Sequence, residues 1–257
     1  MTGCRDPTDL WGRKPAGYTV RQNGRVATRV AFFQHSNWDR PGIFGDRARE
    51  LGWDVARFRV DRMDEALPEV DDFDVLVTLG SAASVTDPSV AWIPAERRLV
   101  TQAVEAGQPV LGVCFGGQLL AQVLGGEVHR ASQAEVGWHL VETDDPSAIP
   151  PGPWVTWHED EFVVPPGADV IARTEVSPHA FIQGTHTGVQ FHPEATAEIV
   201  DHWITGALHT GSVSPEEVGN LRDGFLQFSE SASAMARTLF DGFVHRAGLL
   251  GASRLSD

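Results

Sequence analysis

The sequence predicts an α/β fold with an open, mostly parallel β-sheet and helices on both faces. Three observations support this prediction. In the first half, uninterrupted apolar runs alternate with segments of helical periodicity, which is typical of buried parallel strands. After residue 125, short strand-like runs separated by Pro and Gly indicate a small antiparallel β portion. From Glu194 the helical pattern returns, which indicates a C-terminal helical extension.

The first half alternates four predicted strands with three predicted helices. The apolar runs predict strands at 30–33, 53–60, 73–79 and 109–113, and the helical patterns cover 41–52, 95–106 and 119–124. Gly52 and Gly107 end the first two helices, and Pro94 opens the second. In such a sheet we expect the ligand site at the carboxyl ends of the strands.

The second half predicts shorter strands and then helices. Strands are expected at 127–130, 136–142, 154–157, 169–174, 180–183 and 188–191, and helices at 194–209, 215–228 and 231–246. We therefore divide the chain into an irregular leader (1–25), a catalytic-type α/β domain (26–210) and a helical extension (211–257). The extension either packs on the sheet or forms an arm for a partner.

Composition excludes several classes of function. Thirty-five acidic against 20 basic residues give a net charge of −15, which disfavours binding to nucleic acid or to anionic membranes. Lys14 is the only lysine, so Schiff-base chemistry and a phosphate-binding Gly-x-x-x-x-Gly-Lys loop are excluded. The two cysteines, Cys4 and Cys114, form no Cys-x-x-Cys pair, and the first residues lack an apolar signal region. We expect a protein of the reducing cytoplasm.

The segment Gly112-Val113-Cys114-Phe115-Gly116-Gly117-Gln118 predicts a nucleophile elbow. It follows an apolar strand, and helical residues follow it, so the thiol would stand at the sheet edge beside a helix N-terminus that favours thiolate. Glycines on both sides of Cys114 remove steric clashes from so sharp a turn. The alternative is a buried cysteine that only fills space.

The segment Gln190-Phe191-His192-Pro193-Glu194 predicts the partner groups. A thiol nucleophile needs a base, and an imidazole base needs an acceptor that fixes its tautomer and orientation. His192 and Glu194 meet these needs, and the proline between them restricts the backbone. Alternatively, His192 is only a hydrogen-bonded histidine and Glu194 complements a helix dipole.

With both segments present, the sequence resembles the triad-type class I glutamine amidotransferases from about residue 28 to 205, particularly glutaminase domains of GMP synthases. Three further segments support the resemblance: Leu79-Gly80-Ser81-Ala82-Ala83-Ser84-Val85, Glu135-Val136-Gly137-Trp138 and Trp157-His158-Glu159-Asp160. The resemblance implies a flavodoxin-like fold and a reaction without metal or cofactor. The sequence also lacks a His-Glu-x-x-His zinc motif.

The resemblance also implies a role for each site residue. Cys114 would attack the glutamine amide, His192 would be the base, and Glu194 would orient it. Backbone N–H groups of Phe115 and of the Gly80-Ser81 loop would stabilise the oxyanion. A set of four residues would bind or line the substrate pocket: Gly116, Gln118, Gly137 and Trp138.

Two departures from the family pattern lead to further expectations. Ser81 stands where the family commonly has glycine, so we expect backbone strain if a left-handed turn is needed there. Gly116-Gly117 replaces a Gly followed by a larger residue, so we expect a wider pocket beside the thiol.

Three functions remain open from the sequence. The favoured one is a glutaminase whose ammonia passes to an acceptor on a separate synthase-type protein, because no acceptor-activating domain or pyrophosphatase loop is present. The second is a hydrolase of another γ-glutamyl amide that releases an amine. The third is a non-catalytic interaction module.

Overall fold

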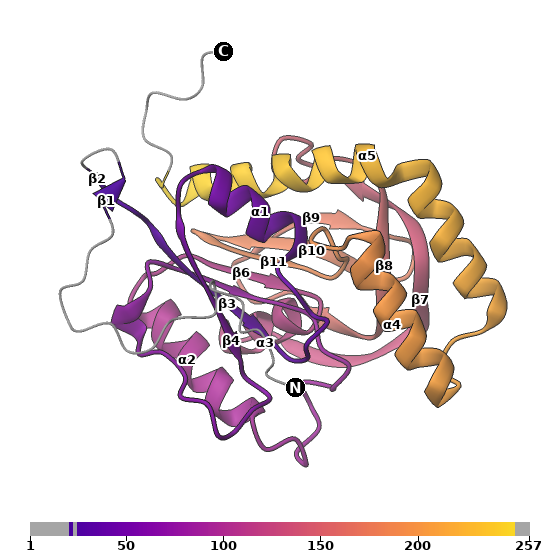
Figure 1. Ribbon diagram of the computed structural model, residues 1–257, viewed down its shortest axis with the longest axis horizontal. Coiled ribbons are helices and arrows are strands. Elements are labelled where there is room, and N and C mark those ends of the chain that lie inside the picture. Colours follow the sequence, from indigo (N-terminus) through magenta and orange to yellow (C-terminus); the bar gives the residue numbers. More distant parts are fainter. Residues whose placement is uncertain (1–20, 23–24, 250–257) are drawn as a thin grey trace, which may run out of the picture.

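A mixed β-sheet runs through the protein, with strand order β4-β3-β5-β6-β11-β10-β9-β7-β8 (Figure 1). The computed structural model describes residues 21–22 and 25–249. Five neighbouring strands are parallel: β4 (Asp54–Arg59), β3 (Arg29–Gln34), β5 (Val75–Thr78), β6 (Val110–Val113) and β11 (His186–Val189). Their carboxyl ends therefore share one edge, as the sequence predicts.

The rest of the sheet is antiparallel and continues directly from β11. It consists of β10 (Pro178–Gln183), β9 (Asp169–Arg173), β7 (Glu127–Thr143) and β8 (Gly152–Val163). The strands predicted at 127–130 and 136–142 are parts of one strand, β7, and the strand predicted at 154–157 is the centre of β8. Register irregularity between Arg130 and Glu135 accounts for the polar interruption in the sequence.

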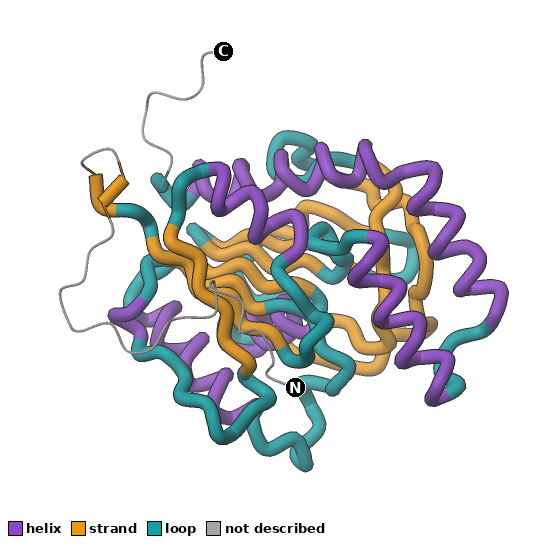
Figure 2. Tube along the Cα trace, viewed as in Figure 1, coloured by secondary structure: helices purple, strands orange, loops and turns teal. Residues whose placement is uncertain are grey.

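Helices cover both faces of the parallel strands (Figures 1 and 2). On one face α1 (Gly42–Glu50) and the second half of α5 (Pro215–Arg246) pack on the sheet. On the other face lie α2 (Ile93–Glu105) and α3 (Phe115–Val123). Alternate side chains of β3 enter the two cores, Phe32 one and Phe33 the other. This arrangement confirms the predicted α/β fold.

A third apolar core lies beside the antiparallel part. Here α4 (Ala197–Thr210) and the first half of α5 pack against β8 through Val155, Ile204 and Leu221. The helices predicted at 215–228 and 231–246 are one uninterrupted helix, so the predicted break is wrong. Serines lower helix propensity by only about 0.5 kcal/mol each, which packing on both cores outweighs.

Three short elements lie outside the main sheet and the longer helices. A 3₁₀ helix, η1, covers Val70–Asp72, and two short antiparallel strands, β1 (Arg21–Gln22) and β2 (Arg25–Val26), stand before the sheet. The predicted irregular leader thus contains β1, while its residues 1–20 lie outside the described residues.

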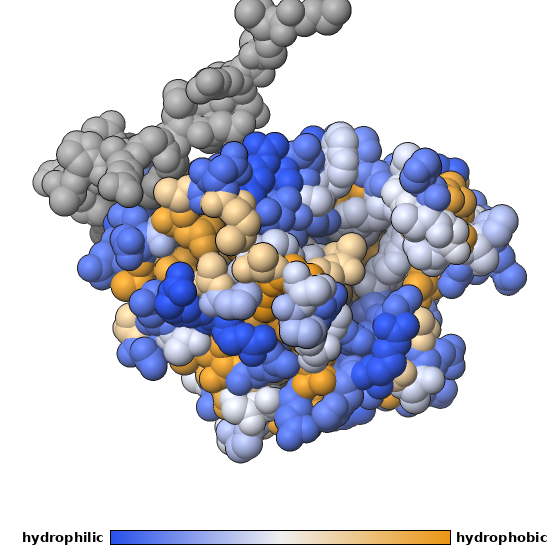
Figure 3. Space-filling view, turned by 90° about the horizontal axis from the view of Figure 1, so that it is seen from below, coloured by the Kyte–Doolittle hydropathy of each residue, from blue (hydrophilic) through white to orange (hydrophobic). Residues whose placement is uncertain are grey.

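Seen from below, the surface is mainly hydrophilic with separate apolar patches (Figure 3). Within residues 21–22 and 25–249, no helix combines the length and apolarity that a membrane crossing requires.

Candidate active site

Cys114 occupies a strained turn between β6 and α3. Its φ of 50° and ψ of −108° make it the one described non-glycine residue with positive φ. A Cβ on Gly112 would lie 2.4 Å from the Gly116 oxygen, and a Cβ on Gly116 would lie 2.1 Å from the Thr78 oxygen. The flanking glycines are therefore required for the turn, and its strain marks a functional position. The backbone has the geometry of a nucleophile elbow.

The sheet brings His192 to this turn. Strand β11 pairs in parallel with β6, and the Cys114 N–H donates to the Val189 oxygen at 2.8 Å. The His192 N–H donates to the Val155 oxygen of β8 at 2.8 Å. The His192 side chain then hydrogen-bonds with the Cys114 thiol, and its Nδ1 lies 2.9 Å from Glu194 Oε1. The structure thus brings Cys114, His192 and Glu194 together.

The environment favours a charged His192. Burial opposes the charge, but the negative charges at Glu194 and Cys114, with their hydrogen bonds, outweigh burial and raise the pKa of His192 well above its ordinary value. The indole of Trp203 packs on the imidazole, with ring centres 4.7 Å apart. The site therefore stabilises His192 in its protonated, imidazolium form.

The start of α1 fixes the backbone of Glu194. The Ile43 N–H donates to the Glu194 oxygen at 3.1 Å. Gly42 precedes it with φ of +48°, and a Cβ there would lie 1.9 Å from that same oxygen. Only glycine fits this contact, so the first helix of the fold helps to aim the carboxylate at the imidazole.

The predicted oxyanion donors lie beside the triad. A Cβ on Gly80 would lie 2.7 Å from His192 Cε1, which places this glycine against the base. The N–H groups of Ser81 and Phe115 have no acceptor among the residues that the structure describes. Ser81 does not have positive φ, so the expectation of left-handed strain at this position is wrong.

The predicted pocket residues Gly116 and Gln118, and Gly117 between them, make close contacts inside the fold. Gly117 approaches the backbone of β11 so closely that a Cβ would lie 2.6 Å from the Val189 oxygen, and Gly116 approaches Thr78 in the same way. These glycines let α3 approach the sheet, and the wider pocket expected beside the thiol stays a prediction. Gln118 is buried and donates to the Asp160 oxygen at 2.9 Å and to Gln190 Oε1 at 3.3 Å.

Gly137 and Trp138 are neighbours in β7, but they contact different parts of the protein. Gly137 is buried in β7 with φ of +133°, and its carbonyl accepts from Thr156. The Trp138 side chain is held by α5, where its Nε1 donates to the Leu221 oxygen at 3.0 Å and its ring packs on Phe225. These contacts connect Trp138 with the C-terminal helix rather than with the thiol.

Two residues that sequence reasoning did not assign contact the thiol directly. Gln190 Nε2 lies 3.6 Å from Cys114 Sγ, and the Trp157 oxygen lies 3.7 Å from it. Both residues belong to segments quoted for the family resemblance, so these segments could have indicated that Gln190 and Trp157 lie near the thiol. Gln118 joins them through Gln190, which makes a continuous hydrogen-bonded lining behind the thiol.

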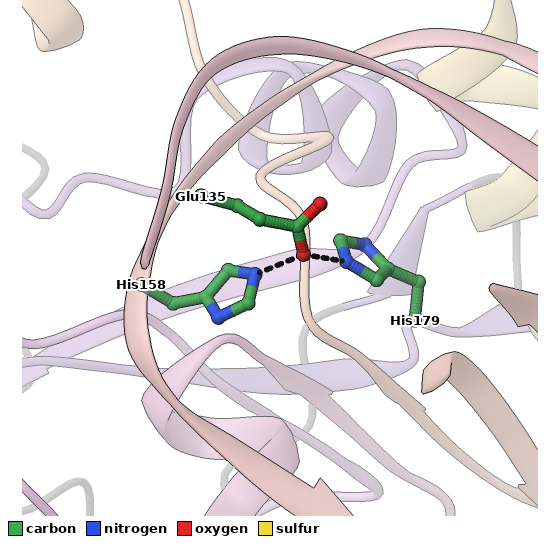
Figure 4. Close-up of side chains that lie close together, drawn as sticks. All are labelled: Glu135, His158 and His179. Atoms are coloured by element: carbon green, nitrogen blue, oxygen red, sulfur yellow. Dashed lines mark hydrogen bonds and ion pairs between the residues drawn. The ribbon is translucent and has the colours of Figure 1, made fainter. Parts of the chain in front are cut away.

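A buried cluster of one carboxylate and two imidazoles lies in the antiparallel part of the sheet (Figure 4). Glu135, His158 and His179 come from β7, β8 and β10, and each side chain is at most 1% exposed. His179 Nε2 lies 2.8 Å from Glu135 Oε2, and His158 Nε2 lies 3.2 Å from it. Glu135 and His158 lie in segments quoted for the resemblance, but no local pattern groups them with His179, because the three residues come from separate strands.

These three side chains are the described group that could hold a metal ion. Glu135 Oε2 also accepts hydrogen bonds from Thr174 Oγ1 at 3.2 Å and from Ser177 Oγ at 3.4 Å. Protein donors therefore already surround the carboxylate. Despite its burial, the hydrogen bonds and charges of the two histidines hold the pKa of Glu135 far below its ordinary value. The cluster thus connects strands β7, β8 and β10 through the contacts of the Glu135 carboxylate with the two histidines.

A separate surface cavity of about 780 Å³ lies between residues 85–90 and α2. Arg97 and Arg98 line it, and none of its lining residues belongs to the Cys114 triad. The sheet edge where Cys114, His192 and Glu194 meet is therefore the candidate active site, and this cavity is not.

Comparisons with known proteins show which proteins this chain resembles. Residues 45–205 match the glutamine amidotransferase class-I family. A GMP synthase of Aeropyrum pernix is 37% identical over 179 residues, which is 63% of this chain and 33% of that protein. The glutamine amidotransferase-like protein YfeJ of Salmonella typhimurium is 30% identical over 190 residues, which is 68% of this chain and 80% of that protein. The match thus covers about a third of the length of the Aeropyrum relative.

Solved structures share the fold over most of the chain. A glutamine amidotransferase from Methylobacillus flagellatus has a TM-score of 0.76 and 26% identity, covering 90% of this chain and 99% of that one. A glutamine amidotransferase from Thermotoga maritima has a TM-score of 0.76 at 23% identity, covering 86% of this chain and 99% of the other. Both alignments extend beyond the 161 residues from 45 to 205, so they include part of the helical extension or of the first strands.

Proposed function

Because this chain belongs to the class I glutamine amidotransferase family, we propose that it hydrolyses the side-chain amide of glutamine through a thioester on Cys114. The observation that carries the proposal is the buried contact of Cys114 with His192, which is in turn oriented by Glu194. A strained elbow, an oriented base and free N–H groups nearby are the parts that acyl transfer requires.

The chemical steps follow from these positions. His192 takes the thiol proton, and the Cys114 sulfur attacks the amide carbon. The amide oxygen becomes an oxyanion, which the Phe115 and Ser81 N–H groups stabilise. The C–N bond then breaks, and His192 returns the proton to the leaving ammonia. Water, deprotonated by His192, attacks the thioester, which gives glutamate and restores the thiol.

The proposal extends to ammonia transfer to an acceptor on a separate synthase-type partner. Its support is that the chain matches about a third of the Aeropyrum GMP synthase, with the remaining two thirds of that protein unmatched. Hydrolysis of another γ-glutamyl amide, with release of an amine, is the alternative, and the same thioester chemistry would serve it.

The test is amide hydrolysis by purified wild type and single variants. We expect glutamate release from glutamine, its loss in Cys114→Ala and His192→Ala, and a loss about 10- to 100-fold smaller in Glu194→Gln, because the carboxylate orients and breaks no bond. Cys4→Ala is the matched control and should keep the wild-type rate. Activity in a folded Cys114→Ala protein, or release only from γ-glutamyl amines, would contradict the proposal.

A further inference from the structure

Another buried histidine–carboxylate pair, His35 with Glu96, lies behind the oxyanion loop and takes no part in the reaction steps above. His35 follows β3, and Glu96 lies in the first turns of α2; the two side chains are at most 1% exposed. His35 Nε2 lies 3.0 Å from Glu96 Oε2, and Thr78 Oγ1 donates to Glu96 Oε1 at 2.5 Å. A buried pair of charged groups is costly to maintain, so a function is expected for it.

The other nitrogen of His35 contacts the oxyanion loop. Its Nδ1 lies 2.8 Å from the Gly80 oxygen. A carbonyl can only accept, so Nδ1 carries the hydrogen and donates it. A hydrogen bond between His35 Nε2 and Glu96 Oε2 requires a second proton between these two atoms. The hydrogen on Nδ1 therefore stays available for the Gly80 oxygen. The Glu96 charge and hydrogen bond also outweigh burial and raise the pKa of His35.

The imidazole has no room to turn away from the loop. Its ring is stacked on Trp92, with centres 4.8 Å apart, and contacts Phe115 at 4.9 Å. Phe115 supplies the other proposed oxyanion donor, so one histidine contacts both elements of the oxyanion site. The preceding carbonyl, that of Leu79, accepts from the Gly116 N–H at 3.1 Å. Two successive carbonyls of the loop are therefore anchored inside the protein.

Anchoring the Gly80 carbonyl determines where the next N–H points. The described chain contains no cis peptide bond, so the Gly80 C=O and the Ser81 N–H of this peptide point in opposite directions. With the carbonyl directed at His35, the Ser81 N–H is directed away from His35. It has no acceptor among the described residues, and Gly80 itself lies against His192.

We propose that His35, held by Glu96, is a positioning residue that locks the Gly80–Ser81 peptide with its N–H available to the oxyanion. The idea rests on the proposed glutaminase activity. Without the lock, this peptide can rotate and turn its carbonyl toward the reacting oxygen. The expected effect is on the reaction step and not on substrate binding, because the oxyanion exists only during the reaction.

The kinetic test compares three variants of the full chain. His35→Phe keeps the aromatic stack but removes the donor, and His35→Asn keeps an N–H donor near the Nδ1 position. His186→Phe makes the same change at the far end of β11. For His35→Phe we expect kcat to fall about 100- to 1000-fold with KM within about threefold. His35→Asn should recover at least about tenfold of that loss, and His186→Phe should retain the wild-type kcat.

Alkylation of Cys114 by iodoacetamide provides the readout that separates positioning from general damage. This displacement forms no oxyanion, so its rate in His35→Phe should stay within about twofold of wild type. A folded His35→Phe protein with kcat within threefold of wild type, no recovery in His35→Asn, or alkylation that falls in parallel with kcat would overturn the proposal.

Crystal structures of wild type and His35→Phe test the lock independently of activity. We expect the Gly80 carbonyl to turn from its wild-type direction in the variant. If wild type fails to hydrolyse glutamine, the proposed function is wrong, and the crystal comparison alone decides the lock. An unchanged Gly80–Ser81 peptide in the variant would overturn it.

Discussion

At the scale of single residues, the reactive pair behaves as one electrostatic unit. The pKa of His192 is raised because burial is outweighed by the negative charge of Glu194 and of the Cys114 sulfur. We expect Cys114→Ser to lower the pKa of His192, since the hydroxyl stays neutral and its charge no longer supports the imidazolium. NMR titration of the His192 ring measures this change. An unchanged pKa of His192 in the variant would contradict the pairing.

Glu135 should stabilise the fold in a pH-dependent way. Its folded pKa is held far below its ordinary value of 4.5, so the stabilisation is complete above pH 4.5 and is lost as the pH falls through lower values. Glu135→Gln should lower the free energy of unfolding by about 3 kcal/mol at pH 7, because the histidines lose their charged partner. The difference from wild type should shrink below pH 4.5.

Urea unfolding at several pH values measures this effect. Glu142→Gln, on an exposed position of the same strand, is the matched control and should change stability by less than about 0.5 kcal/mol. A Glu135→Gln difference that grows on acidification would show that the carboxylate is not the stabilising form.

At the scale of elements, α5 shows how a glycine adapts a helix to its neighbour. A Cβ at Gly224 would lie 2.0 Å from the Trp138 ring, whereas a Cβ at Gly219 meets nothing within 4 Å. We expect Gly224→Ala to destabilise the protein by about 1–3 kcal/mol through overpacking. Gly219→Ala, the same change in the same helix, should stabilise it by about 0.4–1 kcal/mol. Thermal unfolding of the two variants checks that their changes in stability have opposite signs. Equal changes would mean that the Trp138 side chain moves aside at no cost in stability.

The elements also show what a sequence can reveal. The apolar runs and their glycine and proline boundaries predicted β3, β5 and β6, because continuous burial on both faces of these strands leaves a clear pattern. The break predicted near Ser229 failed because serines are weak helix breakers that tertiary packing overrides. The split of β7 failed because a register irregularity inserts polar residues into a continuous strand.

The same reasoning applies to the site. Cys114, His192 and Glu194 lie in short local motifs, so the sequence could indicate them and the sheet brings them together. The contacts of His35 with Gly80 and of Glu135 with His179 join segments from different strands, and no local pattern encodes them. The backbone angle of Ser81 and the close approach of Gly117 to β11 could not be predicted from the sequence, because backbone geometry and packing distance are properties of the folded chain.

At the scale of the whole molecule, α5 belongs to the core of the domain. Leu239, Phe240 and Phe243 are fully buried beneath the sheet, and Arg47 of α1 forms an ion pair with Asp241 at 2.7 Å. Burying three such side chains contributes about 5 to 9 kcal/mol, which is comparable with the about 5–15 kcal/mol that stabilise a typical domain. A chain that ends at residue 214 should therefore fail to fold.

Circular dichroism melting of that truncated chain measures the loss of cooperative unfolding. Deletion of residues 1–20, whose sequence lacks apolar periodicity, is the matched control and should leave the melting temperature nearly unchanged. A cooperative melt at the wild-type temperature without α5 would show that the helix is only an accessory.

The position of β11 in the sheet has a consequence for how this protein is made. The ribosome releases the thiol-bearing strand long before the strand that leads to His192, and β11 must then insert between β6 and β10, in the interior of the sheet. Until that insertion, a growing chain contains Cys114 but lacks the placed imidazole of His192. It also lacks the β11 backbone to which the Cys114 N–H donates. Glutamine hydrolysis as proposed here thus begins only after the sheet is complete, and unfinished chains release no ammonia.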